Sequence, residues 1–115
     1  MATLGELERA VMDLLWASEE SQSAYQLQEQ LTGRELAATT VLTVLSRLEA
    51  KGFVERERSS RPHRYRAVAS REDHMATLMH DVLGGATDRT AVLERFVGSV
   101  TPEDAEALRR LLGPR

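Results

Sequence analysis

Residues 39–48 read TTVLTVLSRL, and this stretch decides the fold. At helical spacing its valines and leucines, Val41, Val44, Leu45 and Leu48, share one apolar face. The opposite face carries short side chains and one arginine, and its candidate DNA-contacting residues are Thr39, Thr40, Thr43, Ser46 and Arg47. Hydroxyl groups can bind phosphates and base edges, and arginine pairs with guanine. The stretch therefore predicts a recognition helix for the major groove of DNA.

The charge distribution supports this interpretation, although the net charge of the chain is −3. Residues 47–66 contain seven basic and three acidic residues, so positive charge is concentrated directly after the threonine-rich helix. Because a local patch sets the electrostatic surface that a nucleic acid meets, the overall acidity does not exclude DNA binding.

Two further helices are predicted before residue 39. The first spans residues 4–16, with an apolar stripe of Leu4, Leu7, Val11, Leu14 and Leu15. The second begins at Ser23, where Gln26 three residues later completes a capping box, and we expect it to bury Tyr25, Leu27 and Leu31. Gly33 lies just past its expected end, and Gly52 ends the third helix.

After Gly52 the sequence indicates a β-hairpin. Residues 53–58 and 63–68 read as two short strands around the turn at residues 59–62. The second strand should place Tyr65 and Ala67 on one face and Arg64 and Arg66 on the other. Three helices followed by a basic hairpin are the element order of a winged helix-turn-helix. In such a domain the third helix enters the groove, and the hairpin rests on the sugar-phosphate backbone.

Three amphipathic helices are predicted in residues 70–115, with Ser70 and Asp73 capping the first, Gly84 and Gly85 ending it, and Thr101 opening the last. So short a segment cannot bury three apolar stripes by itself, so we expect a second copy of the chain to cover them. The candidate dimerisation residues are Met75, Leu78, Met79, Val82, Leu93, Phe96, Val97, Leu108, Leu111 and Leu112. The predicted fold is mainly α with a small β-hairpin: a winged-helix DNA-binding domain at residues 1–69 and a helical dimerisation domain at residues 70–115. Such a homodimer would bind a palindromic site.

Four segments together resemble the penicillinase-repressor (BlaI/MecI-type) family: LERAVMDLLW at residues 7–16, TTVLTVLSRL, KGFV at residues 51–54, and the hairpin with Tyr65. The resemblance implies a dimeric, non-enzymatic winged-helix repressor of β-lactam-resistance or related genes. It also implies a membrane-bound sensor protease that relieves repression by cutting the C-terminal half of the repressor. Well-known members are cut at an Asn-Phe bond, whereas Phe96 here follows Arg95.

The resemblance also implies roles for single residues. Thr40 and Thr43 would contact base edges or phosphates, and Arg47 would bind a phosphate or a base. Thr39 stands where some members carry a longer polar residue, and Leu42 could touch a thymine methyl group. The hairpin residues that would contact the DNA backbone are Arg58, Arg61, His63 and Arg64.

Several other functions receive no support from the sequence. The chain has no cysteine, and His63, His74 and His80 do not have the spacing of a metal site, so neither a metal nor another cofactor is expected. Catalytic and phosphate-binding motifs are absent. No apolar run is long enough for membrane insertion, so we expect a cytoplasmic protein.

Other interpretations remain open from the sequence. The hydroxyl face and the hairpin arginines could be ordinary solvent-facing surfaces. The chain could be a winged-helix regulator that binds a small molecule at its dimer interface, or a winged helix used as a protein-interaction module. Trp16 is interpreted as a packing residue of the core or hinge.

Overall fold

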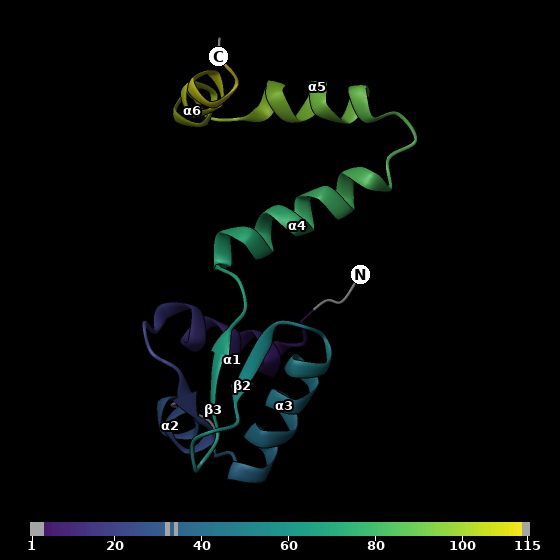
Figure 1. Cartoon of the computed structure of the whole chain (residues 1–115). Coiled ribbons are helices and arrows are strands. Elements are labelled where there is room, and N and C mark those ends of the chain that lie inside the picture. The colour runs from purple at the N-terminus through teal and green to yellow at the C-terminus, as the bar shows by residue number, and fades with distance from the viewer. Residues whose placement is uncertain (1–3, 32, 34, 114–115) are drawn as a thin grey trace. The chain divides into compact units, whose positions relative to one another are not determined.

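The computed structural model describes residues 4–31, 33 and 35–113. In the N-terminal part the elements are α1 (Glu6–Ala17), β1 (Gln22–Ser23), α2 (Ala24–Gln30), α3 (Ala38–Ala50), β2 (Val54–Glu57) and β3 (Arg64–Ala67). They are followed by α4 (Arg71–Gly84), α5 (Arg89–Ser99) and α6 (Pro102–Leu112) (Figure 1). This order confirms the predicted fold class, a winged helix-turn-helix followed by helices.

Contacts group the chain into two compact units, residues 1–76 and 77–115, so that α4 begins in the first unit and ends in the second. The outer ends of the two predicted domains, residues 1 and 115, lie outside the described residues. The functional division into a DNA-binding and a dimerisation part stays a prediction.

The helix boundaries follow the capping signals in the sequence. The Ser23 hydroxyl accepts a hydrogen bond from the Gln26 amide, and the Ser23 amide donates to the Gln26 side chain, so the capping box of α2 is confirmed. At the end of α3, Gly52 has a φ of +85°, and the Phe53 amide donates to the Leu48 carbonyl at 2.9 Å. This is the left-handed helix ending that glycine favours. Thr101 caps α6 through the Asp104 amide, with Pro102 at the first helical position.

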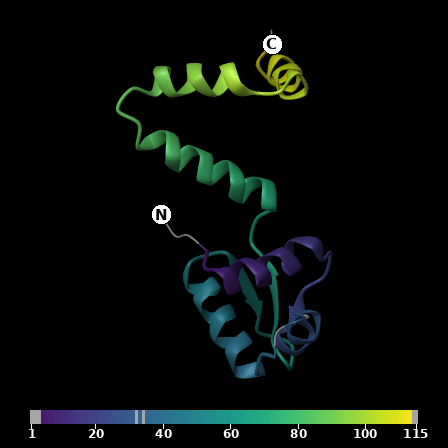
Figure 2. The same ribbon diagram turned by 180° about the vertical axis from the view of Figure 1, so that it is seen from behind.

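A three-stranded antiparallel sheet, in the order β1-β3-β2, lies beside the helices of the first unit (Figures 1 and 2). The predicted hairpin is present, with Val54 opposite Ala67 and Glu57 opposite Arg64. The sequence did not predict β1, in which Gln22 pairs with Tyr65 and Ser23 with Arg64. A strand of two residues is too short to show the alternation of side chains that identifies strands.

One aliphatic core joins α1, α2, α3 and the sheet. Its buried members are Val11, Met12, Leu15, Ala24, Leu27, Leu31, Val41, Val44, Leu45, Leu48, Val54 and Tyr65. The prediction that Tyr25 is buried is wrong, because its side chain is 57% exposed. Residues 25 and 27 lie on nearly opposite sides of a helix, and α2 buries Ala24 and Leu27 instead.

Residues 77–113, the described part of the second unit, form no such core. No residue of α5 or α6 is buried, although both helices are fully described. Large apolar side chains stand exposed on them and on the second half of α4, among them Met79, Val82, Phe96, Leu111 and Leu112. Within this unit, Val97, Val100, Ala105, Leu108 and Leu112 line an apolar hollow of about 390 Å³ between α5 and α6. A screen of the described helices for a segment able to span a bilayer finds none.

Candidate nucleic-acid interface

The two faces of α3 separate as the sequence predicts. Its four aliphatic residues are buried in the core, while Thr39, Thr40, Thr43, Ser46 and Arg47 are all exposed. Leu42 is also 40% exposed, beside the hydroxyl side chains. Because burial fixes the inner face against the rest of the winged helix, the outer face presents its short side chains from a rigid helix.

Within this exposed face the Thr43 hydroxyl donates to the carbonyl oxygen of Thr39 at 2.9 Å. This bond uses the hydroxyl proton but leaves oxygen lone pairs that can accept a hydrogen bond. The Thr43 oxygen can therefore accept a hydrogen bond from a donor such as the amino group of cytosine or adenine.

An ion pair holds the end of α3 against α1. The Lys51 ammonium group lies 2.8 and 2.9 Å from the two carboxylate oxygens of the nearly buried Glu8. The Gly5 amide donates to the same carboxylate at 2.8 Å. The hydrogen bond from Lys51, and then that from Gly5, lowers the pKa of Glu8 below its ordinary value of 4.5, against the opposing effect of burial.

Sequence reasoning missed this pair. The signal was a single acidic residue on the inner side of an otherwise apolar helix face. Its cationic partner lies 43 residues away in sequence, so the spacing could not identify it.

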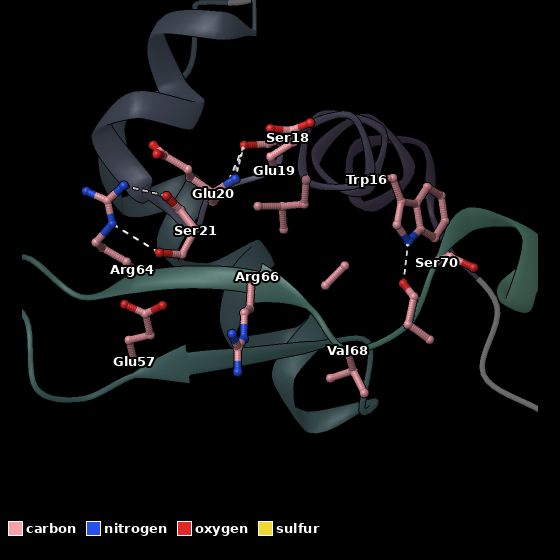
Figure 3. A pocket seen from close by; sticks show the side chains of 13 residues that line it. Trp16, Ser18, Glu19, Glu20, Ser21, Glu57, Arg64, Arg66, Val68 and Ser70 are labelled. Atoms are coloured by element: carbon pink, nitrogen blue, oxygen red, sulfur yellow. Dashed lines mark hydrogen bonds between the residues drawn. The ribbon is translucent and has the colours of Figure 1, made fainter.

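The hairpin presents its basic residues in two different ways. Arg58 and Arg61 are exposed near the turn, and the Arg61 guanidinium lies 2.9 and 3.1 Å from the ring nitrogens of the half-buried His63. Arg64 is half-buried and donates to the Ser21 hydroxyl at 3.1 Å and to the Ser21 carbonyl at 2.5 Å (Figure 3). Arg64 therefore ties β3 to the segment before β1.

Two further arginines of the sheet are paired with acids. Arg66 lies directly opposite Glu55 in the hairpin, at 2.6 Å. Arg56 reaches Glu49 of α3 at 3.8 Å. These pairs connect the hairpin internally and to α3, whereas Arg58 and Arg61 project from the hairpin as exposed side chains.

An open hollow of about 730 Å³ lies between the α1–β1 segment and β3 (Figure 3). Its walls carry both signs of charge, with Glu19, Glu20 and Glu57 facing Arg64 and Arg66. At one end the Trp16 indole donates to the carbonyl oxygen of Ala69 at 3.1 Å. The remaining two histidines do not line this hollow. His74 is buried in the first turns of α4, and His80 is exposed on the same helix.

A winged helix with an exposed short-side-chain face on its third helix is the architecture that the class of winged-helix transcriptional regulators uses. The sequence model of the penicillinase repressor family matches residues 4–113. The transcriptional regulators BlaI of Mycobacterium tuberculosis strains CDC 1551 and H37Rv are each 47% identical to this chain, over 97% of it and 84% of their own length. The chain belongs to the penicillinase repressor family, as its sequence motifs predict, and the family is not enzymatic.

Solved structures show the same fold at low sequence identity. A MarR family protein from Bacillus stearothermophilus is 19% identical, with a TM-score of 0.53 over 96% of this chain and 71% of its own. The protein in the complex structure of hsRosR-S4 is 21% identical, with a TM-score of 0.55 over 91% of this chain and 92% of its own. These likenesses concern the fold alone.

Proposed function

We propose that this transcriptional regulator represses genes by binding a palindromic operator as a homodimer. The observation that carries the proposal is the exposed face of α3, with Thr39, Thr40, Thr43, Ser46 and Arg47, opposite a face buried in the core. In this arrangement α3 enters the major groove, where Arg47 pairs with a guanine or a phosphate and the threonines contact base edges.

The hairpin supplies affinity. Arg58 and Arg61 contact phosphates beside the groove, and His63 supports Arg61 through their close contact. Arg64 contributes mainly by holding β3 to Ser21, and reaches a phosphate only through its remaining donor capacity. Contacts of this kind are salt-dependent and largely independent of sequence.

The homodimer forms through the helices that follow the winged helix. The helices α4, α5 and α6 each expose large apolar side chains, among them Val82, Phe96 and Leu111. Soluble monomers rarely leave large apolar patches in water. A two-fold interface covers this surface with the same surface of a second copy, and so brings two copies of α3 to two half-sites.

Relief of repression is proposed to follow the family pattern, in which a membrane-bound sensor protease cuts the C-terminal half. In place of the family's Asn-Phe bond, Phe96 of α5 follows Arg95, so the proposal assigns no particular bond to the cut. The regulated genes would be β-lactam-resistance or related genes, and DNA as the partner implies a cytoplasmic location.

The test is a mobility-shift titration, at two salt concentrations, with operators recovered by genome-wide mapping of bound DNA. We expect a retarded complex with palindromic duplexes that weakens steeply as salt rises. An absence of binding at low salt would overturn the proposal and favour a protein-interaction module. Release of DNA by a β-lactam added to the pure complex, with no sensor present, would favour a regulator that binds small molecules.

A further inference from the structure

The first turn of α4 is held against the winged helix by a cluster of aromatic and charged side chains. The cluster consists of Trp16 and Asp13 of α1, Phe53 after α3, and Arg71 and His74 of α4. Every residue of α4 is described, and among them only His74 is buried. The attachment of α4 to the winged helix therefore depends on this one side chain more than on any other in the helix.

The geometry of the cluster is specific. The ring of His74 lies 5.3 Å from that of Trp16 and 5.1 Å from that of Phe53, tilted against the former and edge-on to the latter. The Arg71 guanidinium lies over the Trp16 ring at 5.4 Å and pairs with Asp13 at 3.5 Å. The Trp16 indole also donates to Ala69, directly before α4 (Figure 3).

Each of these contacts restrains a different degree of freedom. The packing of His74 between two rings fixes the rotation of the first turn of α4, because aromatic pairs favour edge-on and offset geometries. The cation over Trp16 and its pairing with Asp13 restrain the helix laterally. The indole hydrogen bond holds the connecting chain at Ala69.

We propose that Trp16 and His74 are positioning residues for operator choice: by fixing α4 on the winged helix, they set the half-site spacing that the dimer accepts. The inference rests on the proposed function, because α4 leads into the helices that join two copies. A helix transmits the orientation of its first turn along its length, so a loosened first turn lets each winged helix reorient within the dimer. Neither residue belongs to the proposed DNA-contacting surface of α3 and the hairpin.

The experiment measures binding of the full-length protein to a set of duplexes. Each carries two inverted copies of the half-site recovered by in vitro selection, with the spacer varied one base pair at a time, and a further duplex carries one half-site. Trp16→Phe and His74→Ala are compared with the natural protein. His80→Ala removes an exposed histidine of the same helix and is the matched control.

We expect the natural protein and His80→Ala to prefer one spacer strongly. In His74→Ala the preferred duplex should bind about threefold to tenfold more weakly, as loss of an aromatic contact implies, while disfavoured spacers change little. The spacing profile, meaning the affinity plotted against spacer length, therefore becomes flatter. His74→Phe keeps a ring between Trp16 and Phe53 and should restore the profile. Affinity for the single half-site should stay unchanged, which a general loss of folding could not produce.

Trp16 also provides a readout that does not involve DNA, since it is the single tryptophan of the chain. His74→Ala should make its fluorescence more accessible to a soluble quencher, whereas His80→Ala should not. Unchanged quenching together with an unchanged spacing profile in His74→Ala would overturn this inference alone. A natural protein that binds none of the duplexes would overturn the inference together with the proposed function.

Discussion

At the scale of single residues, the role expected of an arginine in the proposed DNA interface depends on the element that carries it. Arg47 and Arg61 are both exposed arginines, yet one projects from α3 and the other from the hairpin. A helix in the major groove meets base edges, whereas a hairpin beside it meets phosphates. The same residue type is therefore expected to serve specificity in one place and affinity in the other.

Replacing Arg47 with alanine tests the first role. We expect Arg47→Ala to weaken specific binding by about 1–3 kcal/mol and to relax the preference for one base. Arg9→Ala, which removes an exposed arginine of α1, is the control for lost charge. Affinities for the operator and for its single-base variants check this, and an unchanged ratio between them would show that Arg47 reads no base.

Replacing Arg61 with alanine tests the second role. The variant should bind all sequences more weakly by a similar factor, and the slope of log affinity against log salt should fall by about 1. Titrations at several salt concentrations provide the slope. If Arg61→Ala changed base preference and left the slope alone, the hairpin would have been assigned the wrong role.

The Glu8–Lys51 pair has a consequence for stability that depends on pH. The pKa of Glu8 is lowered in the folded state, so its ion pair stabilises the fold above the unfolded value of about 4.5 and loses that effect as pH falls through the folded pKa. We expect Glu8→Gln to destabilise the protein by about 1–3 kcal/mol at neutral pH and by much less in acid. Urea unfolding at both pH values measures this, with the exposed Glu29→Gln as control. An equal loss of unfolding free energy at both pH values would mean that the charge of Glu8 does not stabilise the fold.

At the scale of elements, local signals predict the helices well and the pairing of distant segments poorly. Ser23, Gly52 and Thr101 are residue types whose capping role depends on immediate neighbours, so the ends of α2, α3 and α6 could be predicted. The strand β1 depends on Tyr65 and Arg64, more than 40 residues away, and no local pattern announces it. Likewise, the bond from Arg64 to Ser21 is visible only in three dimensions, and the expected contact of Arg64 with the DNA backbone stays a prediction.

The capping box of α2 gives a prediction at this scale. Ser23→Ala removes the acceptor of the Gln26 amide, which is 3.2 Å away, and should destabilise the fold by about 1 kcal/mol. Ser23→Thr keeps a hydroxyl and should lose less, and the exposed Ser59→Ala is the control. Chemical denaturation measures the differences. Equal stability of Ser23→Ala and the natural protein would show that the cap contributes nothing to α2.

At the scale of the whole molecule, the winged helix has a core of its own, whereas the helices after it do not. The sequence predicted this difference because apolar stripes can be counted against the length that must bury them. The sequence does not show which stripe would contact which in the proposed dimer, because the residue spacing within one copy does not encode contacts between two copies. Family membership likewise follows from the motifs and from the match over residues 4–113, while operator and inducer do not.

The proposed dimer yields the last prediction. Val82 is 76% exposed and Leu112 is 75% exposed, so a charge at either position costs little in an isolated chain. In a dimer that buries them, the same charge is costly. We therefore expect Val82→Glu and Leu112→Glu to weaken self-association at least about tenfold without unfolding the winged helix. Their affinity for a full palindrome should fall towards that for a half-site.

Sedimentation equilibrium and the palindrome titration measure the two effects together. Thr87→Glu places the same charge at an exposed polar position between α4 and α5 and should alter neither. A dimer that survived both substitutions would have its interface elsewhere. The exposed apolar side chains of α4 and α6 would then indicate a different partner, because large apolar patches are rarely left exposed to water.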